Sequence, residues 1–278
     1  MIKIYSFHSI NTWKKLLIFG AIHGNEICWT KAINKIIEKI ELGIIKIASW
    51  EVIFVPVCNP IAHDWNKRYH EVNLNRVFKK YYNTKNYEEK LANILTEYVD
   101  NCDYFLDLHS MASNWKPFVF QDYESPETEE FAKMIGQKNI IKGWPKMYET
   151  LDTSDTLLYA HDQWKTGVLI ECGKHDDNSA VDVAYNTIEN AMKYLWIIEW
   201  NLNILQENDF NIIKAKKIFF KQKEWKFIKD RDHLDEIKEW DLIAIYDDWE
   251  KLVAENDWYI LLPNSTTNIW EEWFYIWV

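Results

Sequence analysis

The chain lacks long apolar runs and a surplus of basic residues, and each absence excludes a class of protein. No stretch approaches the ~20 apolar residues of a membrane span, and the first ten residues lack the pattern of a signal peptide. The formal net charge is -11, and nucleic-acid affinity comes mainly from neutralising phosphates with Lys and Arg. We therefore expect a soluble cytoplasmic protein that binds neither nucleic acid nor membrane. These features leave open whether it forms a homo-oligomer.

Cysteine is also sparse. Cys28, Cys58, Cys102 and Cys172 are widely separated and form no Cys-x-x-Cys pair. This is too few for a secreted, disulfide-bonded chain of this length, so we predict buried, reduced thiols.

Glycine is scarce relative to ordinary usage, and tryptophan is in excess. The chain has 7 Gly and 16 Trp, whereas usage of roughly 7% predicts about 20 glycines. Trp249 and Trp258 each follow an Asp between strand-like runs, where Asp-Gly is a turn signal and a bulky residue would be strained. Some bacteria read the codon UGA as glycine, while a common alternative translation table gives tryptophan. We hypothesise that many of these tryptophans are glycines in the cell.

Hydrophobic periodicity predicts alternating strands and helices over most of the chain. The predicted strands cover residues 16–19, 51–57, 104–110, 118–120 and 167–170, and the predicted helices cover 27–41, 87–99, 126–136 and 178–202. From Asn211 onward, short apolar alternations with turn signals indicate a small all-β unit. We predict an α/β fold with a mostly parallel, mixed sheet flanked by helices in residues 1–205. A small β domain in residues 206–278 would cover or flank the active site.

Ionisable residues follow several of the predicted strands. His23 and Glu26 come just after the apolar run at 16–19, and His109 and Glu171 end later strands. Open α/β proteins bind ligands at this carboxyl edge of the sheet. Taken alone, His23 and Glu26 also fit a helix start with an exposed histidine. Whether His23 and Glu26 bind a ligand therefore depends on the other residues near them.

Three ligand-type residues, His23, Glu26 and His109, are the number that a catalytic zinc site takes from its protein. A carboxylate on a neighbouring strand end suits proton transfer, which is the role we predict for Glu171. The irregular loop at residues 61–80 is rich in polar side chains, and Arg68, Asn75 and Arg76 would suit an oxyanion or a carboxylate. The alternative for each arginine is a solvated surface charge.

Together these segments resemble the succinylglutamate desuccinylase and aspartoacylase family, which are zinc amidohydrolases with a zinc carboxypeptidase-like fold. The matching pieces occur in the family's order between residues 16 and 173, and residues 257–263 resemble its β domain. The pieces are Gly20-Ala21-Ile22-His23-Gly24-Asn25-Glu26, Asn59-Pro60, Arg68, Asn73-Leu74-Asn75-Arg76, Asp107-Leu108-His109-Ser110 and Glu171-Cys172-Gly173.

The resemblance assigns a role to each candidate residue. It implies that His23, Glu26 and His109 hold one zinc ion per chain and that Glu171 is the general acid and base. It further implies that Arg68 polarises the scissile carbonyl and that Asn75 and Arg76 bind a substrate carboxylate.

The sequence departs from the family pattern at several positions. Asn73 stands where the family usually has Asp, and His161 lies where aspartoacylases carry a further substrate-binding Arg. The resemblance therefore does not extend to N-acetylaspartate as substrate. Tryptophan also occupies four positions where the family usually has Gly, namely 29, 65, 240 and 258.

Three functions remain open at this point. The leading one is a zinc-dependent deacylase that hydrolyses the amide bond of a small N-acyl amino acid. The runner-up is a zinc carboxypeptidase acting on a peptide or cell-wall fragment, since the same zinc ligands and arginine could hold a peptide C-terminus. The third is a non-catalytic ligand-binding homologue, which would be free to lose His23, Glu26, His109 or Glu171.

Overall fold

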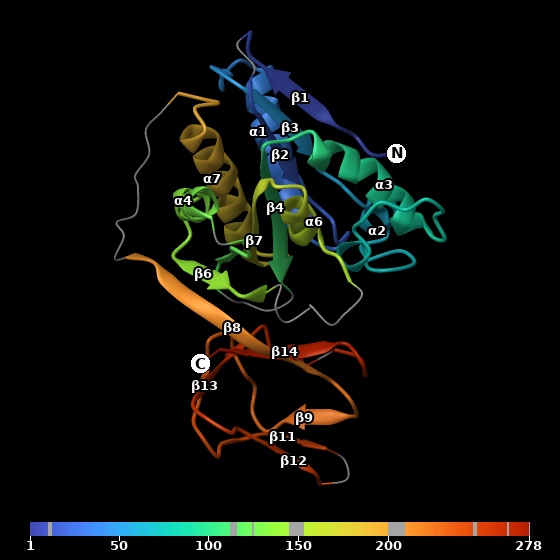
Figure 1. The fold of residues 1–278 in the computed structure, drawn as a ribbon, viewed down its shortest axis with the longest axis vertical. Helices are drawn as coiled ribbons and strands as arrows, with labels where there is room; N and C mark the ends of the chain where they lie inside the picture. Colours follow the sequence, from blue (N-terminus) through green and yellow to red (C-terminus); the bar gives the residue numbers. More distant parts are fainter. Residues whose placement is uncertain are drawn as a thin grey trace.

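The computed structural model describes residues 1–10, 13–111, 116–123, 125–144, 153–199, 209–246, 249–265 and 267–277. Within them an α/β domain lies above a smaller β-rich C-terminal part (Figure 1). The helices are α1 (Ile27–Glu41), α2 (Pro60–Asp64), the 3-10 turn η1 (Leu74–Arg76), α3 (Tyr87–Asp100), α4 (Pro126–Met134), α6 (Thr156–Asp162) and α7 (Asn178–Tyr194). No helix in these ranges combines the length and apolarity needed to cross a membrane.

A large mixed sheet forms the centre of the molecule. Its order is β1-β3-β2-β4-β7-β5-β6-β8-β14-β13-β10. Strands β2, β3, β4 and β7 are mutually parallel, whereas β1 and β5 pair antiparallel with their neighbours β3 and β7. The strands of the α/β part are β1 (Tyr5–His8), β2 (Lys15–Phe19), β3 (Glu51–Val55), β4 (Tyr104–Met111), β5 (Phe118–Phe120), β6 (Asn139–Lys142) and β7 (Thr166–Lys174). The predicted fold class is confirmed.

Helices cover both faces of this sheet because its strands are apolar on both sides. Leu16 and Ile18 of β2 pack into a core with α1, α4 and α7. Their neighbours Leu17 and Phe19 pack into a second core with α3 and α6. Successive strand residues point to opposite faces, so an uninterrupted apolar run fills both cores.

The C-terminal strands continue the large sheet and add a small one. Strand β8 pairs in parallel with β6 through residues 211–214 and then antiparallel with β14. Figure 1 shows this long strand running from the α/β domain into the C-terminal part. A separate three-stranded sheet has the order β12-β11-β9. The strands are β8 (Asn211–Phe220), β9 (Trp225–Phe227), β10 (Glu236–Ile237), β11 (Leu242–Tyr246), β12 (Lys251–Val253), β13 (Trp258–Leu261) and β14 (Glu272–Trp277).

Element boundaries mostly agree with the predictions. Helix α1 and strand β5 match them to the residue, whereas α7 ends at Tyr194 instead of at residue 202. The proposed domain boundary at residues 205 and 206 lies outside the described residues. All four cysteines are buried and free, as predicted.

Tryptophan has an unusual backbone in this structure. Ten non-glycine residues in the described ranges have positive φ, and six of them are Trp50, Trp164, Trp196, Trp240, Trp249 and Trp270. The expectation of a strained backbone is confirmed for Trp249, with φ of 67°. It is wrong for Trp258, which begins strand β13 and is not among the positive-φ residues.

Candidate functional site

The loop that joins β2 to α1 is held by close backbone packing. A Cβ at Gly24 would lie 2.1 Å from the carbonyl carbon of Ala62 and 2.2 Å from the backbone nitrogen of His63, so only glycine fits there. The Gly24 N–H also donates to the carbonyl of Arg68 at 3.3 Å. The loop is therefore pinned against α2. His23 and Glu26 beside it are almost fully buried.

His23, Glu26 and His109 meet in one cluster. His23 Nδ1 lies 2.7 Å from Glu26 Oε1, and His109 Nδ1 lies 3.2 Å from Glu26 Oε2. One ligand atom from each residue can be chosen so that all three lie within 4.8 Å of one another. Two imidazoles and a carboxylate are the donor set of a zinc site, so the residues present fit this metal.

The electrostatics of His23 and Glu26 also favour a bound cation. Burial and the nearby Arg68 lower the pKa of His23 to about 4, which keeps the imidazole neutral and able to bind a metal. Burial opposes charge on Glu26, but His23 and His109 hold its pKa well below the usual range. Glu26 is thus a carboxylate buried between two imidazoles.

Each histidine is oriented by a residue behind it. His109 Nε2 donates to Asp107 Oδ2 at 3.0 Å, and His23 Nε2 donates to Asn73 Oδ1 at 3.1 Å. Both Nδ1 atoms therefore face Glu26. Such partners fix the imidazole and raise its basicity, and a carboxylate does so more strongly than an amide. The two histidines are unequally supported, because Asp107 is a carboxylate and Asn73 is an amide.

Glu171 lies beside His109 because the two residues are register partners on the parallel strands β4 and β7. Its Oε2 is buried and has no hydrogen-bond partner among the described residues. Burial and the charge of Glu26 raise the pKa of Glu171 well above its usual value. The prediction that His109 and Glu171 end their strands is slightly wrong, since β4 continues to Met111 and β7 to Lys174.

The remaining predicted residues line the same cavity, which has a volume of about 820 Å³. Arg68 Nη1 lies 3.7 Å from Glu26 Oε1. Asn75 Oδ1 accepts from the Thr156 N–H at 3.0 Å, which orients its amide. Arg76 Nε and Nη2 donate to Glu272 Oε1 of β14 at 2.9 and 2.6 Å. The cavity is lined by every predicted site residue except Glu26, which is in contact with His23 and His109.

His161 has a different environment from the arginine expected at its position. It is buried in α6, its Nε2 donates to the Gly167 carbonyl at 3.1 Å, and it does not line the cavity. Burial lowers its pKa to about 4, so it brings no positive charge to the site.

Sequence reasoning missed several residues of this region. Asp107 lies two residues before His109 on the same strand, and the two-residue period of a strand would have placed both on one face. No comparable signal marks Glu272, which reaches the site from the C-terminal sheet.

The family profile of the succinylglutamate desuccinylase/aspartoacylase catalytic domain matches residues 12–195. The chain belongs to this family. A protein from Prochlorococcus marinus named probable aspartoacylase is 33% identical over 175 residues, which is 60% of this chain and 56% of that protein. The match therefore spans a little over half the length of this relative.

Solved structures of low sequence identity have the same fold. One is a succinylglutamate desuccinylase/aspartoacylase from Rhodobacter sphaeroides, with a TM-score of 0.78 and 14% identity, covering 100% of this chain and 88% of that one. Another is the ectoine utilization protein EutE (DoeB) from Ruegeria pomeroyi, with a TM-score of 0.76 and 14% identity, covering 99% and 88%. At this identity the likeness establishes the fold alone.

Proposed function

We propose that this protein is a zinc-dependent deacylase that hydrolyses the amide bond of an N-acyl amino acid. The observation that carries the proposal is the cluster of His23, Glu26 and His109, with Glu171 beside His109 on the next strand. The family match supports the reaction class.

His23, Glu26 and His109 would hold the zinc ion, and Asp107 and Asn73 would orient the two imidazoles. When bound, zinc acts as a Lewis acid on the acyl carbonyl and lowers the pKa of a water molecule towards ~7. Arg68 is close enough to the cluster to stabilise negative charge that develops on the carbonyl oxygen.

Glu171 would move the proton. Its raised pKa lets the same carboxyl group accept a proton from the attacking water and deliver it to the amide nitrogen of the leaving amino acid. The buried, unpartnered Oε2 is suited to this exchange, because no other described residue competes for it.

Asn75 and Arg76 would bind the α-carboxylate of the amino acid. Guanidinium and amide N–H groups both donate to carboxylates, and Thr156 holds the oxygen of the Asn75 amide. This contact would place the scissile amide between the metal cluster and Glu171.

The test is a zinc-loaded assay on N-acetyl amino acids together with short peptides that have free C-termini. We expect one zinc ion per chain and release of free amino acids from the acylated substrates. His109→Ala should lose zinc and turnover, whereas His8→Ala, on the exposed edge strand β1, should lose neither. The proposal fails if the zinc-loaded protein hydrolyses no N-acyl amino acid. Hydrolysis of the peptides alone would indicate a carboxypeptidase instead.

A further inference from the structure

Acidic side chains outnumber arginine side chains in the lining of the active-site cavity. Among the described residues, Arg68 and Arg76 are the lysine or arginine side chains that line it. The acidic ones are Glu71, Asp122, Asp155, Glu171, Glu271 and Glu272. An N-acyl amino acid with an acidic side chain would bring a second carboxylate into this negative field.

Both arginines are already close to carboxylates of the protein. Arg68 lies 3.7 Å from Glu26, and Arg76 makes two hydrogen bonds to Glu272. The α-carboxylate of the substrate is assigned to Arg76 in the function proposed above. His23 and His109 would be occupied as zinc ligands, burial lowers the pKa of His175, and His161 does not line the cavity. The described residues of the lining therefore offer no further cationic side chain to a side-chain carboxylate.

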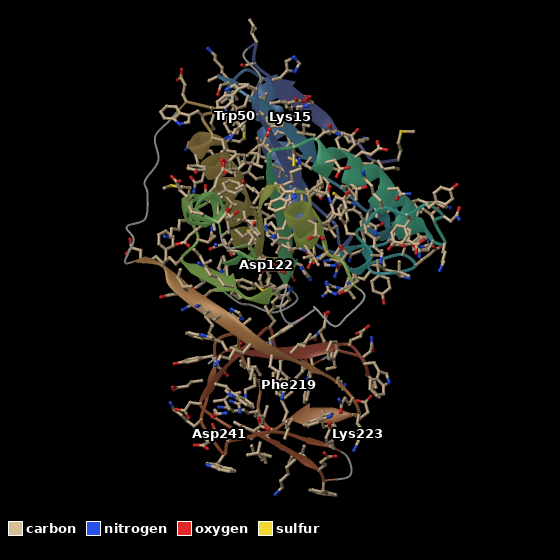
Figure 2. All side chains as sticks on the ribbon, in the orientation of Figure 1. Lys15, Trp50, Asp122, Phe219, Lys223 and Asp241 are labelled. Carbon is tan, nitrogen blue, oxygen red and sulfur yellow. The ribbon has the colours of Figure 1, made fainter. Side chains whose placement is uncertain are left out.

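The wall formed by Asp122 and Asp155 favours the opposite charge. Asp155 caps α6 by accepting from the Leu158 N–H at 2.7 Å. Asp122 Oδ1 is inaccessible to solvent and accepts no hydrogen bond from a described residue. Figure 2 shows Asp122 at the edge of the α/β domain that faces the C-terminal strands.

The ionised form of Asp122 has no cationic neighbour among the described residues, whereas that of Asp155 has Arg76 nearby. Burial and the neighbouring Asp155 raise the pKa of Asp122 well above its usual value. Burial also raises the pKa of Asp155. An ammonium or guanidinium group between them would stabilise both carboxylates.

We propose that the cavity selects N-acyl amino acids with a cationic side chain, bound by Asp122 and Asp155, over those with an acidic side chain. Asp122 and Asp155 would attract a cationic side chain of the substrate. Glu272, which accepts hydrogen bonds from Arg76, would repel an acidic one. This inference rests on the deacylase function proposed above and names its substrate class.

The experiment compares N-acetylornithine, N-acetylglutamine and N-acetylglutamate, which are similar in length and differ in charge. With zinc-loaded protein, we expect kcat/KM for N-acetylornithine to exceed that for N-acetylglutamate at least tenfold, with N-acetylglutamine between them. Asp122→Asn should reduce this ratio at least tenfold. Asp162→Asn, an exposed carboxylate on α6 outside the cavity, should preserve it.

Calorimetric titration with free ornithine and glutamate separates this inference from the function on which it rests. If no substrate is hydrolysed but ornithine binds more tightly than glutamate, the deacylase function fails and the charge selectivity stands. Equal or better binding and turnover of the glutamate compounds overturns the charge selectivity while leaving a deacylase.

A second inference concerns the left-handed tryptophans. Five helices are followed, one residue after their C-cap, by a residue with positive φ, and after α2 this residue is Asn66. After α1 and α4 this residue is Gly43 or Gly136, and after α6 and α7 it is Trp164 or Trp196. This is the position at which glycine commonly ends a helix, because it lacks a Cβ.

The hydrogen bonds are the same at four of these helix ends, those of α1, α2, α6 and α7. The residue with positive φ donates to the carbonyl three residues earlier, and its successor donates to the carbonyl five residues earlier. The second bond is 2.9 Å from Ile44 to Lys39, 2.9 Å from Lys67 to Ala62, 2.9 Å from Lys165 to Ala160 and 2.8 Å from Ile197 to Met192. The backbone at Trp164 and Trp196 therefore has the same left-handed, hydrogen-bonded conformation as the backbone at Gly43.

Packing gives no reason for tryptophan at most of these positions. Trp164, Trp196, Trp240, Trp249 and Trp270 are all exposed, with relative exposures from 63% to 85%. A left-handed conformation costs an ordinary residue energy that glycine avoids. An exposed indole recovers little of this cost by burial.

We infer that the six left-handed tryptophans are glycines in the natural protein, encoded by UGA. Two observations test this: the codons of the gene at the six positions, and the masses of tryptic peptides of the protein isolated from its own cells. We expect UGA codons and peptides with glycine at positions 164 and 196. UGG codons, or tryptophan in those peptides, would overturn the inference.

Discussion

Replacing Asp107 by Asn should weaken zinc binding without removing a ligand. Asp107 is fully buried, accepts from His109 Nε2 at 3.0 Å and also accepts from the Thr156 hydroxyl. Asn keeps an acceptor oxygen but removes the charge that strengthens the imidazole as a ligand. Loss of such a partner typically weakens metal affinity by about 10–100-fold.

This loss can be converted into a change in thermal stability. Zinc at 1,000 times its dissociation constant stabilises the wild-type protein by about 4.1 kcal/mol. A weakening of about 10–100-fold leaves roughly 2.7 to 1.4 kcal/mol. For a chain of this size, about 2–4 °C per kcal/mol gives a zinc-induced Tm shift that is smaller by about 3–10 °C.

A substitution at Asn73 should change the zinc affinity in the opposite direction. Its amide oxygen accepts from His23 Nε2 at 3.1 Å and from the Asn75 N–H at 3.0 Å, and Asp can make both contacts. Asn73→Asp should therefore tighten zinc binding and increase the zinc-induced Tm shift.

The assay is a competitive zinc titration against a chromogenic chelator, with thermal melts of each variant with and without zinc. Taking the difference between the two melts removes the effect of each substitution on the metal-free protein. Asp103→Asn is the matched control, because Asp103 lies outside the site and accepts from the Lys15 N–H. An unchanged zinc affinity for Asp107→Asn, or a weaker one for Asn73→Asp, would refute the reasoning.

Three further predictions follow from the same geometry. Glu171→Gln should lower kcat by about 10²–10⁴-fold while zinc content stays the same, because it removes proton transfer and no ligand; an unchanged rate would assign the base elsewhere. His161 has a pKa of about 4 in the folded protein against 6.5 normally. Its stabilising contribution is therefore present above pH 6.5 and is lost as the pH falls through 4, by roughly 3 kcal/mol. The free energy of unfolding, measured with urea across this pH range, should depend less on pH in His161→Gln than in the wild-type protein. An identical pH dependence in the two proteins would contradict the assignment. Trp164→Gly and Trp196→Gly should each stabilise the protein by roughly 0.5–1 kcal/mol, the left-handed penalty less the entropic cost of glycine. Trp→Ala at either position should give no such gain, and equal effects of Gly and Ala in thermal melts would argue against backbone strain.

Local patterns predicted much of the fold. The apolar run within residues 51–57 indicated a strand buried on both faces, and the helical spacing of apolar residues from Ile27 to Glu41 indicated helix α1. Both features depend on contacts within a few residues, so they can be recognised without knowing the rest of the chain. The long C-terminal helix was predicted too long because apolar periodicity continues past Tyr194, whereas the backbone turns at Trp196.

The sequence by itself determined the chemistry available at the carboxyl edge of the sheet: two histidines, two glutamates and the Arg68–Arg76 segment, together with the excess of tryptophan over glycine. Only the tertiary structure decided which groups meet. The register of β4 against β7 places Glu171 beside His109, and the path of β8 carries β14 back so that Glu272 reaches Arg76, which is 196 positions away in the chain. Likewise, Asp122 and Asp155 form one wall only after folding. Charge interactions depend on distance and burial, and both are set by the packing of remote segments and have no counterpart in residue spacing.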